Sequence, residues 1–296
     1  MRIAVIGAGA VGSYFGGLLA RAGHEVTLIG RPAHVEAIRR DGLLIETAVS
    51  AERVCPDADI AVSAATGAQL VLFCVKSTDT VSAGAAVAPY LAAGCTLLSL
   101  QNGIDNAARL ASAAGRPALP CVVHVATALP APGHVQHRGG GRLVLPDRPE
   151  AREVAGLLWH AAIDVELSDN LPGAQWAKLI VNCAYNALSA VARQPFGPLL
   201  RTPGVDELMH DVVRECLAVA QAAGIDVQGD PWVALRRTGS QSEQYSSMAQ
   251  DMARGRRTEI DHLNGYVVRQ GEALGVPTPA NRCLQVAVKL LEARGG

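Results

Sequence analysis

The sequence predicts an α/β protein in two parts, an N-terminal domain built on a parallel sheet and an all-helical C-terminal domain. In the first part, apolar runs of strand length alternate with segments of helical character up to about residue 170. Beyond that point nearly every segment has a helical pattern, and Gly and Pro residues separate one segment from the next. We therefore expect a domain at residues 1–170 and a second at 171–296. The helices expected in the second domain span residues 174–192, 205–223, 231–237, 242–254, 257–274 and 279–293.

Composition excludes several classes of function. The 296 residues include 26 Lys and Arg against 27 Asp and Glu, a net charge of −1, so no basic surface for nucleic acid is expected. No apolar run approaches the roughly 20 residues of a membrane span, and the N-terminus lacks a signal peptide, so we expect a cytoplasmic protein. The 7 Cys show no CxxC spacing and the 8 His no HExxH, so neither disulfides nor a metal site is expected.

The chain opens with a strand, a glycine turn, a helix and a second strand. The apolar residues 2–6 form the first strand, the helix is expected at 10–22, and residues 25–29 form the second strand. Between strand and helix the sequence fits GxGxxG, and its members are Gly7, Gly9, Ala10, Val11 and Gly12. The first glycine permits a tight turn, the second lets the backbone approach a pyrophosphate, and the third lets helix and strand pack closely. Because the flanking elements match, the unit indicates a Rossmann-type dinucleotide-binding domain.

The residue after the second strand indicates which dinucleotide binds. NAD sites place an Asp or Glu there for the ribose 2′-OH, whereas NADP sites favour an Arg near the 2′-phosphate. This sequence has Gly30 followed by Arg31 and no acid, which favours NADP. Two alternatives remain open: Arg31 as a solvated loop residue, and Glu36 curling back to a 2′-OH.

Polar side chains follow two further buried strands. Lys76 comes after the strand expected at 70–75, and Asn102 after the one at 95–100, with a helix at 78–92 between them. Ligands of open α/β sheets bind just beyond the strand carboxyl ends, so both residues are placed where a cofactor would lie. The alternatives are a solvated Lys and an ordinary Asn-Gly turn. The remaining expected features are strands at 42–46, 121–127, 143–145 and 164–167, with Gly139–Gly141 as a turn between the second and third of these.

The helix expected at 174–192 carries an unusual stripe. It is apolar on most sides, yet Lys178, Asn182 and Asn186 stand four residues apart and share one face. Burying a Lys and two Asn without partners costs several kcal/mol, about 1–3 per polar group and more for a charge, which a ligand would offset. An ordinary solvent-facing strip is the alternative, but such strips favour Glu, Lys and Arg.

Two later segments can complete a site. Ser246 and Ser247 lie near the start of a helix, where hydroxyl and backbone N–H groups can bind a carboxylate. Thr258 and Glu259 are expected to open another helix, where Glu is also common for its interaction with the helix dipole. From spacing alone, a role in a ligand site and an ordinary role in the first turn of a helix are equally supported for Glu259.

Together these residues resemble the 2-dehydropantoate 2-reductase (ketopantoate reductase) family. The resemblance covers essentially the whole chain in order, from the glycine motif to the segment at 258–261. The Lys/Asn/Asn helix combined with that segment is specific to the family, whereas the glycine motif alone is not. It implies an NADPH-dependent reduction of a 2-oxo acid, ketopantoate, to the 2-hydroxy acid pantoate on the route to pantothenate and coenzyme A. In such a reaction the cofactor delivers a hydride, and a nearby cation that can donate a proton stabilises the developing oxyanion.

The resemblance also implies a role for each site residue. Lys178 is implied as the general acid, and Glu259 as the acid that engages the substrate hydroxyl and supports it. The implied substrate contacts are Asn102, Asn182, Asn186 and Ser247; the implied cofactor contacts are the glycine motif, Arg31 for the 2′-phosphate, Lys76 and Asn102.

The sequence departs from the family at one substrate position, where Gln244 stands in place of an Asn. The resemblance therefore indicates the reaction class more closely than the substrate, and two alternatives stay open. One is a reductase of another small 2-oxo acid, and the other is a protein that senses NADPH without catalysis. A homodimer is compatible with this type of helical domain, although the sequence shows no exposed patch for it.

Overall fold

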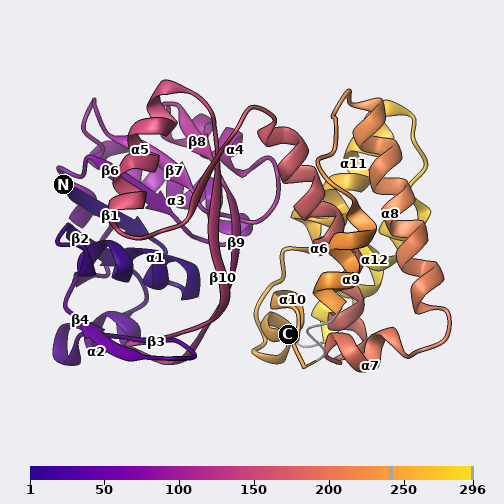
Figure 1. Ribbon diagram of the computed structural model, residues 1–296, viewed down its shortest axis with the longest axis horizontal. Helices are drawn as coiled ribbons and strands as arrows, with labels where there is room; N and C mark the ends of the chain where they lie inside the picture. Colours follow the sequence, from indigo (N-terminus) through magenta and orange to yellow (C-terminus); the bar gives the residue numbers. More distant parts are fainter. Residues whose placement is uncertain (240–242, 295–296) are drawn as a thin grey trace. The chain divides into compact units, whose positions relative to one another are not determined.

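The computed structural model divides into two compact units, Met1–Leu171 and Pro172–Gly296. It describes residues 1–239 and 243–294. The expected fold class is confirmed, because the first unit holds a parallel sheet with helices and the second holds only helical elements among its described residues. Figure 1 shows both units in sequence colours.

The first unit contains a parallel sheet of six strands in the order β5-β2-β1-β6-β7-β8. Its central strands are buried on both faces, which explains why their sequences are continuously apolar instead of alternating. Strand β1 pairs in parallel with β2 on one side and with β6 on the other. The carboxyl ends of all three strands therefore lie at the same edge of the sheet. The strands are β1 (Arg2–Ile6), β2 (Glu25–Ile29), β5 (Asp57–Asp59), β6 (Leu70–Phe73), β7 (Thr96–Ser99) and β8 (Ala118–Pro120).

A second, mixed sheet completes this unit. Its order is β11-β10-β3-β4, and β9 pairs with β10 in an antiparallel hairpin. Its strands are β3 (Leu43–Glu46), β4 (Ala51–Val54), β9 (Val122–Ala131), β10 (His134–Pro146) and β11 (Val165–Ser168). The helices of the unit are α1 (Ala10–Arg21), α2 (Pro32–Asp41), α3 (Thr80–Val87), α4 (Asn106–Ala114) and α5 (Pro149–His160).

Helix α1 packs against both sheets at once. Two adjacent glycines make this possible: a Cβ on Gly16 would lie 2.6 Å from Leu28 Cδ2 of β2, and one on Gly17 would lie 2.7 Å from Ile45 Cδ1 of β3. Neither position can hold a larger side chain without displacing a core residue. The glycines therefore set how closely the helix approaches each sheet.

The expectation of a turn at Gly139–Gly141 is wrong. These glycines lie inside β10, paired with β9, and the hairpin turn comes earlier, at residues 132–133. The register of the hairpin shifts twice across the glycines, at His137/Gly139 and Gly140/Arg142. A Cβ on Gly140 would lie 2.4 Å from the His124 carbonyl oxygen, and its φ is +72°. The glycines thus allow β-bulges within a long strand.

The helical unit is organised around α6, whose buried side chains include Leu179, Ile180 and Tyr185. The Tyr185 hydroxyl donates a hydrogen bond to the Leu235 carbonyl oxygen of α9 at 2.9 Å. Although α6 has 22 residues, no helix in the described part of the chain has the length and hydropathy to cross a membrane. The helices are α6 (Leu171–Ala192), α7 (Phe196–Leu200), α8 (Val205–Ala222), α9 (Pro231–Gly239), α10 (Ser247–Ala253), α11 (Asn264–Leu274) and α12 (Pro279–Arg294).

Two expected helices begin later than the sequence pattern suggests. The helix expected at 242–254 begins at Ser247 and ends at Ala253, and residue 242 lies outside the described residues. Its start is fixed by Ser246, whose Oγ accepts a hydrogen bond from the Ala249 N–H at 3.0 Å. The helix expected at 257–274 is a short 3₁₀ turn, Ile260–His262, followed by α11. Thr258 and Asp261, near the start of the expected helix, make hydrogen bonds to side chains of α12 instead of extending α11.

Candidate active site

The turn between β1 and α1 is fixed by backbone contacts. Gly7 has a φ of +95°, and a Cβ there would lie 2.7 Å from the backbone nitrogen of Val75. The N–H groups of Gly7 and Ala8 both donate to the Ile29 carbonyl oxygen, at 3.0 and 2.9 Å. Only glycine fits the first position, because it needs both a left-handed conformation and a close backbone neighbour.

The other two glycines of the motif have different surroundings. A Cβ on Gly12 would lie 2.4 Å from the Gly7 carbonyl oxygen and 2.9 Å from Val5 Cγ1, so this glycine permits the helix to pack on the turn. At Gly9 a Cβ would meet only the Gly7 oxygen, at 4.0 Å, so the space there is open. The first turn of α1, which includes Ala10 and Val11, holds no acidic residue and no side-chain cap. Its N–H groups and the open space at Gly9 fit a pyrophosphate.

The side chain expected to choose the dinucleotide lies at the start of α2. Arg31 is the exposed N-cap residue of that helix, directly after β2 and Gly30. Within the described residues its guanidinium makes no hydrogen bond or ion pair, which leaves it available to an anion. Glu36 is also exposed, in the next turn of α2. These residues fit a ribose with a 2′-phosphate, although the acidic alternative is nearby.

A buried histidine, which the sequence patterns did not single out, fixes this first turn of α2. His34 Nδ1 accepts a hydrogen bond from the Gly133 N–H at 2.9 Å, so the neutral ring carries its proton on Nε2 and donates to Ser13 Oγ, also at 2.9 Å. Burial lowers the pKa of His34, which keeps the ring neutral. The histidine therefore joins the helix that carries Arg31 to the helix of the glycine turn.

The structure joins the loops that carry Lys76 and Asn102. Lys76 follows β6 and Asn102 follows β7, the neighbouring parallel strand. The Asn102 carbonyl oxygen accepts hydrogen bonds from Ser77 Oγ at 3.1 Å and from Asn106 Nδ2 at 2.5 Å. The two loops are thus held as one surface at the carboxyl end of the sheet.

A buried polar network beneath this surface was not predicted. Gln101 Nε2 donates to the Val75 carbonyl oxygen at 3.0 Å and to Thr80 Oγ1 at 2.7 Å. Thr80 Oγ1 in turn donates to Asn106 Oδ1 at 3.1 Å. All three polar side chains are less than 7% exposed. Asn102 and Asn106 stand four residues apart, but Asn102 precedes α4, so helical spacing does not reveal this network.

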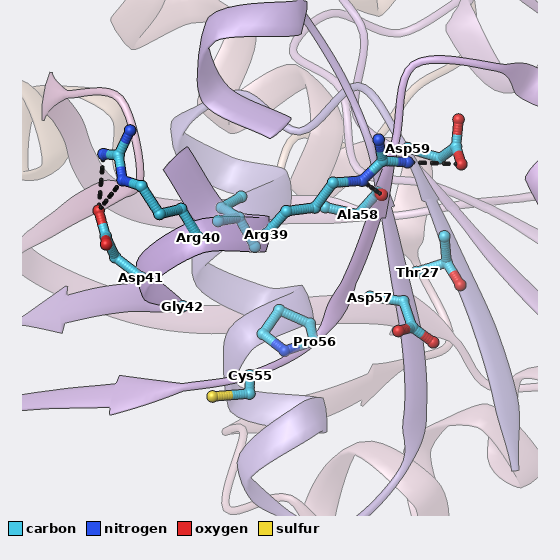
Figure 2. Close-up of a pocket in the computed structure, with 11 residues that line it drawn as sticks. Thr27, Arg39, Arg40, Asp41, Gly42, Cys55, Pro56, Asp57, Ala58 and Asp59 are labelled. Carbon is cyan, nitrogen blue, oxygen red and sulfur yellow. Dashed lines mark hydrogen bonds and ion pairs between the residues drawn. The ribbon is translucent and has the colours of Figure 1, made fainter. Parts of the chain in front are cut away.

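A groove of the first unit lies at the outer edge of its parallel sheet (Figure 2). It encloses about 740 Å³ between the end of α2 and β5, and none of the expected site residues lines it. Four of its five charged side chains pair with one another: Arg39 Nη2 lies 2.8 Å from Asp59 Oδ2, and Arg40 Nη2 lies 2.7 Å from Asp41 Oδ2. Both arginines of the groove are thus already paired with carboxylates, and the fifth charged side chain is Asp57. Across the described residues no group of three His, Cys, Asp or Glu could hold a metal.

In the helical unit, the predicted stripe lies on α6. Lys178 and Asn182 are half-buried, and Asn186 is 7% exposed. Among the described residues the side-chain amides of Asn182 and Asn186 make no hydrogen bond. Neither amide is sealed from solvent, since neither is among the buried side-chain atoms that lack a partner in the described part of the chain. Both amides are therefore available to hydrogen-bond a polar ligand.

The start of α10 contacts the same helix. Ser246 is buried, and its Oγ donates to the Asn186 carbonyl oxygen at 3.1 Å. Ser247, the first residue of α10, is exposed. The two serines therefore have different positions. Ser246 caps α10 and attaches it to α6, whereas Ser247 remains available to a ligand.

The segment that holds Glu259 also packs against the part of α6 that carries the stripe. Glu259 is 6% exposed. Shortly after it, Asn264 Nδ2 donates to the Cys183 carbonyl oxygen at 3.1 Å, and the Tyr266 ring lies 6.1 Å from the Trp176 ring. Because Trp176 and Cys183 flank Lys178 and Asn182, these contacts bring the two segments together within the unit.

Comparisons with known proteins agree with this organisation. Residues 3–150 match the family described as ketopantoate reductase PanE/ApbA, and residues 170–292 match its C-terminal counterpart. The 2-dehydropantoate 2-reductase of Pyrococcus horikoshii is 35% identical over 302 residues, covering 100% of this chain and 99% of that protein. The enzyme of the same name from Halobacterium salinarum is 33% identical over 306 residues, with complete coverage of both.

Solved structures give the same result. A PanE/ApbA family ketopantoate reductase from Ralstonia eutropha JMP134 superposes with a TM-score of 0.96 at 52% identity, covering 100% of this chain and 99% of that one. A ternary structure of D-mandelate dehydrogenase with NADH and anilino(oxo)acetate superposes with a TM-score of 0.91 at 25% identity, covering 100% and 99%. The chain is therefore an oxidoreductase that acts on a CH–OH group with a nicotinamide dinucleotide. It belongs to the ketopantoate reductase family.

Proposed function

We propose that the protein reduces 2-dehydropantoate (ketopantoate) to pantoate with NADPH, a step of pantothenate and coenzyme A biosynthesis. The observation that carries this proposal is the α6 stripe, in which Lys178 shares one helix face with Asn182 and Asn186. The side-chain amides of these two Asn residues make no hydrogen bond in the described residues. Full-length similarity to 2-dehydropantoate 2-reductases supports the choice of substrate. We assign cofactor binding to residues 1–170 and substrate binding and catalysis to residues 171–296.

In this proposal Lys178 is the general acid. Bound NADPH supplies the hydride for the carbonyl carbon. The Lys178 ammonium stabilises the negative charge that develops on the carbonyl oxygen and then donates its proton to that oxygen. Glu259 engages the resulting hydroxyl and supports the lysine.

The remaining site residues bind and orient. Asn182, Asn186 and Ser247 supply hydrogen bonds to the polar groups of the oxo acid. Lys76 and Asn102, on the loops after β6 and β7, bind at the nicotinamide end of the cofactor. The backbone at Gly7, Gly9 and Gly12 and the first N–H groups of α1 bind the pyrophosphate.

Arg31 is proposed to select NADPH over NADH. A charge-assisted hydrogen bond contributes about 1.5–3 kcal/mol, so Arg31→Ala is expected to raise the KM for NADPH by roughly 10- to 100-fold and leave that for NADH unchanged. Arg40→Ala, which removes another exposed arginine of α2, is the matched control. Equal effects on both cofactors would show that Arg31 does not bind the 2′-phosphate.

The proposed substrate is tested by steady-state assay of NADPH oxidation against a panel of 2-oxo acids that includes ketopantoate. The highest kcat/KM is expected with ketopantoate. A second candidate, reduction of another 2-oxo acid, is favoured by the likeness to D-mandelate dehydrogenase and by Gln244. A preference for an aromatic 2-oxo acid would support that candidate, and NADPH binding without any turnover would indicate a sensor.

A further inference from the structure

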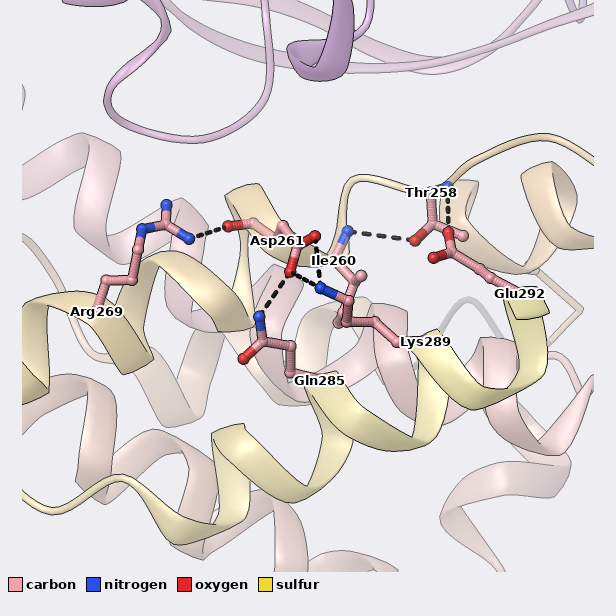
Figure 3. Close-up of polar contacts among 7 residues, drawn as sticks. All are labelled: Thr258, Ile260, Asp261, Arg269, Gln285, Lys289 and Glu292. Atoms are coloured by element: carbon pink, nitrogen blue, oxygen red, sulfur yellow. Dashed lines mark hydrogen bonds and ion pairs between the residues drawn. The ribbon is translucent and has the colours of Figure 1, made fainter.

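Helix α12 holds the segment around Glu259 from one side (Figure 3). Three of its side chains, Gln285, Lys289 and Glu292, reach residues 258–261. Their spacing of four and three residues places them on one face of the helix. Figure 3 shows that face turned towards the segment, with contacts at Thr258 and at Asp261.

The contact before Glu259 is made through the backbone. The Thr258 N–H donates to Glu292 Oε1 at 2.6 Å, and Thr258 itself is 4% exposed. A charge-assisted hydrogen bond of this kind is shorter and stronger than a neutral one. Glu292 therefore fixes the residue that immediately precedes Glu259.

The contact after Glu259 is made through Asp261. Asp261 Oδ1 accepts from Gln285 Nε2 at 2.6 Å and from Lys289 Nζ at 3.1 Å. Arg269 Nη1 donates to the Asp261 carbonyl oxygen at 2.8 Å. Partial burial alone would raise the pKa of Asp261, but the bonds from Gln285 and Lys289 outweigh it and the pKa is lowered. The carboxylate thus stays ionised and paired.

The backbone between these two contacts is not part of an α-helix. Glu259 has φ −98° and ψ 22°, and only a 3₁₀ turn follows it. The Glu259 carbonyl oxygen accepts hydrogen bonds from the His262 and Leu263 N–H groups, at 2.9 and 3.1 Å, so backbone bonds hold the segment on the C-terminal side. The side-chain contacts from α12 act together with these bonds to determine where the backbone of Glu259 lies.

We propose that Gln285, Lys289 and Glu292 are positioning residues that hold Glu259 in place for the substrate hydroxyl. The inference rests on the proposed function, because it assigns Glu259 to that hydroxyl. None of the three residues needs to touch the substrate, since each acts through Thr258 or Asp261. Loss of one contact is expected to misplace Glu259 without unfolding the protein.

The same helix supplies a matched control. Arg282 Nη2 lies 2.5 Å from Glu272 Oε1 of α11, and the two side chains are 52% and 57% exposed. Lys289 and Asp261 are 52% and 37% exposed, so the two ion pairs are similar in kind. Exposed pairs of this type contribute about 0–1 kcal/mol to stability. A purely structural role therefore predicts equal, small effects for Lys289→Met and Arg282→Met.

The experiment compares Lys289→Met, Lys289→Arg and Arg282→Met with the wild type. In Lys289→Met, kcat/KM for the oxo acid is expected to fall roughly tenfold, because a small displacement of a site group has a large effect on rate. The Kd for NADPH and the Tm are expected to match those of Arg282→Met, and Lys289→Arg is expected to recover most of the activity. Equal kcat/KM in Lys289→Met and Arg282→Met would overturn the proposal.

A second readout separates this inference from the proposed function. Hydrogen exchange of the amides in residues 258–263 is expected to be faster in Lys289→Met and unchanged in Arg282→Met. A wild-type protein that reduces no 2-oxo acid counts against the proposed function. Unchanged exchange in Lys289→Met overturns the positioning role by itself, whatever the activity of the wild type.

Discussion

The two units build their parts of the site in different ways. In the first unit the groups that face a ligand are backbone turns and strand ends, such as Gly9. The glycines that permit the first turn all lie within residues 7–12, although that turn contacts the more distant Ile29 and Val75. In the second unit the groups that face a ligand are side chains on helix faces, and residues far away in the sequence fix those faces. The glycine turn is therefore visible in a short stretch of sequence, whereas the anchoring of Glu259 is not.

The long-range character of the second unit extends beyond α12. Glu215 of α8 accepts hydrogen bonds from the N–H groups of Ala280 and Asn281, at 2.8 and 2.9 Å, and so caps the first turn of α12. Asn281 Oδ1 accepts from Asn264 Nδ2, and Asn264 also donates to α6. Helix α8 thus fixes α12, and α12 fixes the segment at 258–261.

The largest effect is expected where the first unit depends on a missing side chain. In Gly12→Val the new Cβ would lie 2.4 Å from a backbone oxygen, so a loss of about 3 kcal/mol or more in the free energy of unfolding is expected. In Gly9→Ala the new Cβ enters open space, so the loss of stability is expected to be under about 1 kcal/mol, while NADPH affinity falls at least roughly tenfold.

Urea denaturation and a fluorescence titration with NADPH separate these two roles. If Gly9→Ala binds NADPH as well as the wild type, the space beside Gly9 does not receive the pyrophosphate. If Gly12→Val keeps its full stability, the helix can move away from the turn and the contrast between the two glycines fails.

Two buried asparagines make the comparison sharper. Asn106 joins the loops after β6 and β7, and Asn281 joins α12 to α8 and α11. Replacing either with Ala is expected to cost about 1–3 kcal/mol, because buried partners lose their hydrogen bonds. Only Asn106→Ala is expected to raise the KM for NADPH as well, by several-fold, since Asn102 and Lys76 stand on the loops it joins. Equal NADPH kinetics in both variants would mean that the Asn106 network serves stability alone.

The sequence predicted the first unit well where the signal was local. The β1–α1–β2 unit has the expected elements because apolar strands and a glycine turn specify it within about 30 residues. The fold class was predicted for a similar reason, since hydrophobic periodicity is also local.

Predictions failed where a distant contact decides the structure. The glycines at 139–141 follow the usual pattern of a turn, but pairing with β9 keeps them in a strand. The helix expected from residue 257 begins at Asn264, because Gln285, Lys289 and Glu292 hold residues 258–261 instead. The Asn106 network was missed because its partners lie on separate loops. The roles given to Lys178, Glu259 and the other site residues remain predictions.

The smallest effect is expected from the pH dependence of stability in the first unit. Burial lowers the pKa of His34 in the folded protein, whereas in the unfolded chain it is about 6.5. Above that pH both states are neutral and His34 has no effect. Below it the unfolded chain binds a proton that the folded protein does not, so stability falls as the pH decreases towards the lowered pKa. In His34→Gln this part of the loss between pH 7 and pH 5 is expected to disappear.

Thermal unfolding at several pH values measures this contribution. His24 also has a lowered pKa and is present in both proteins, so the difference between the two curves isolates His34. Parallel curves for wild type and variant would show that His34 titrates normally in the folded protein.

The central claim is that Lys178 of the helical unit donates the proton, and the Lys178→Ala variant tests it most directly. Its kcat with ketopantoate and NADPH is measured alongside its Kd for NADPH. We predict that kcat falls by about 100-fold or more, the usual contribution of a positioned acid, while the Kd for NADPH stays within about twofold of the wild type. A Lys178→Ala protein that retains the wild-type kcat would contradict the account.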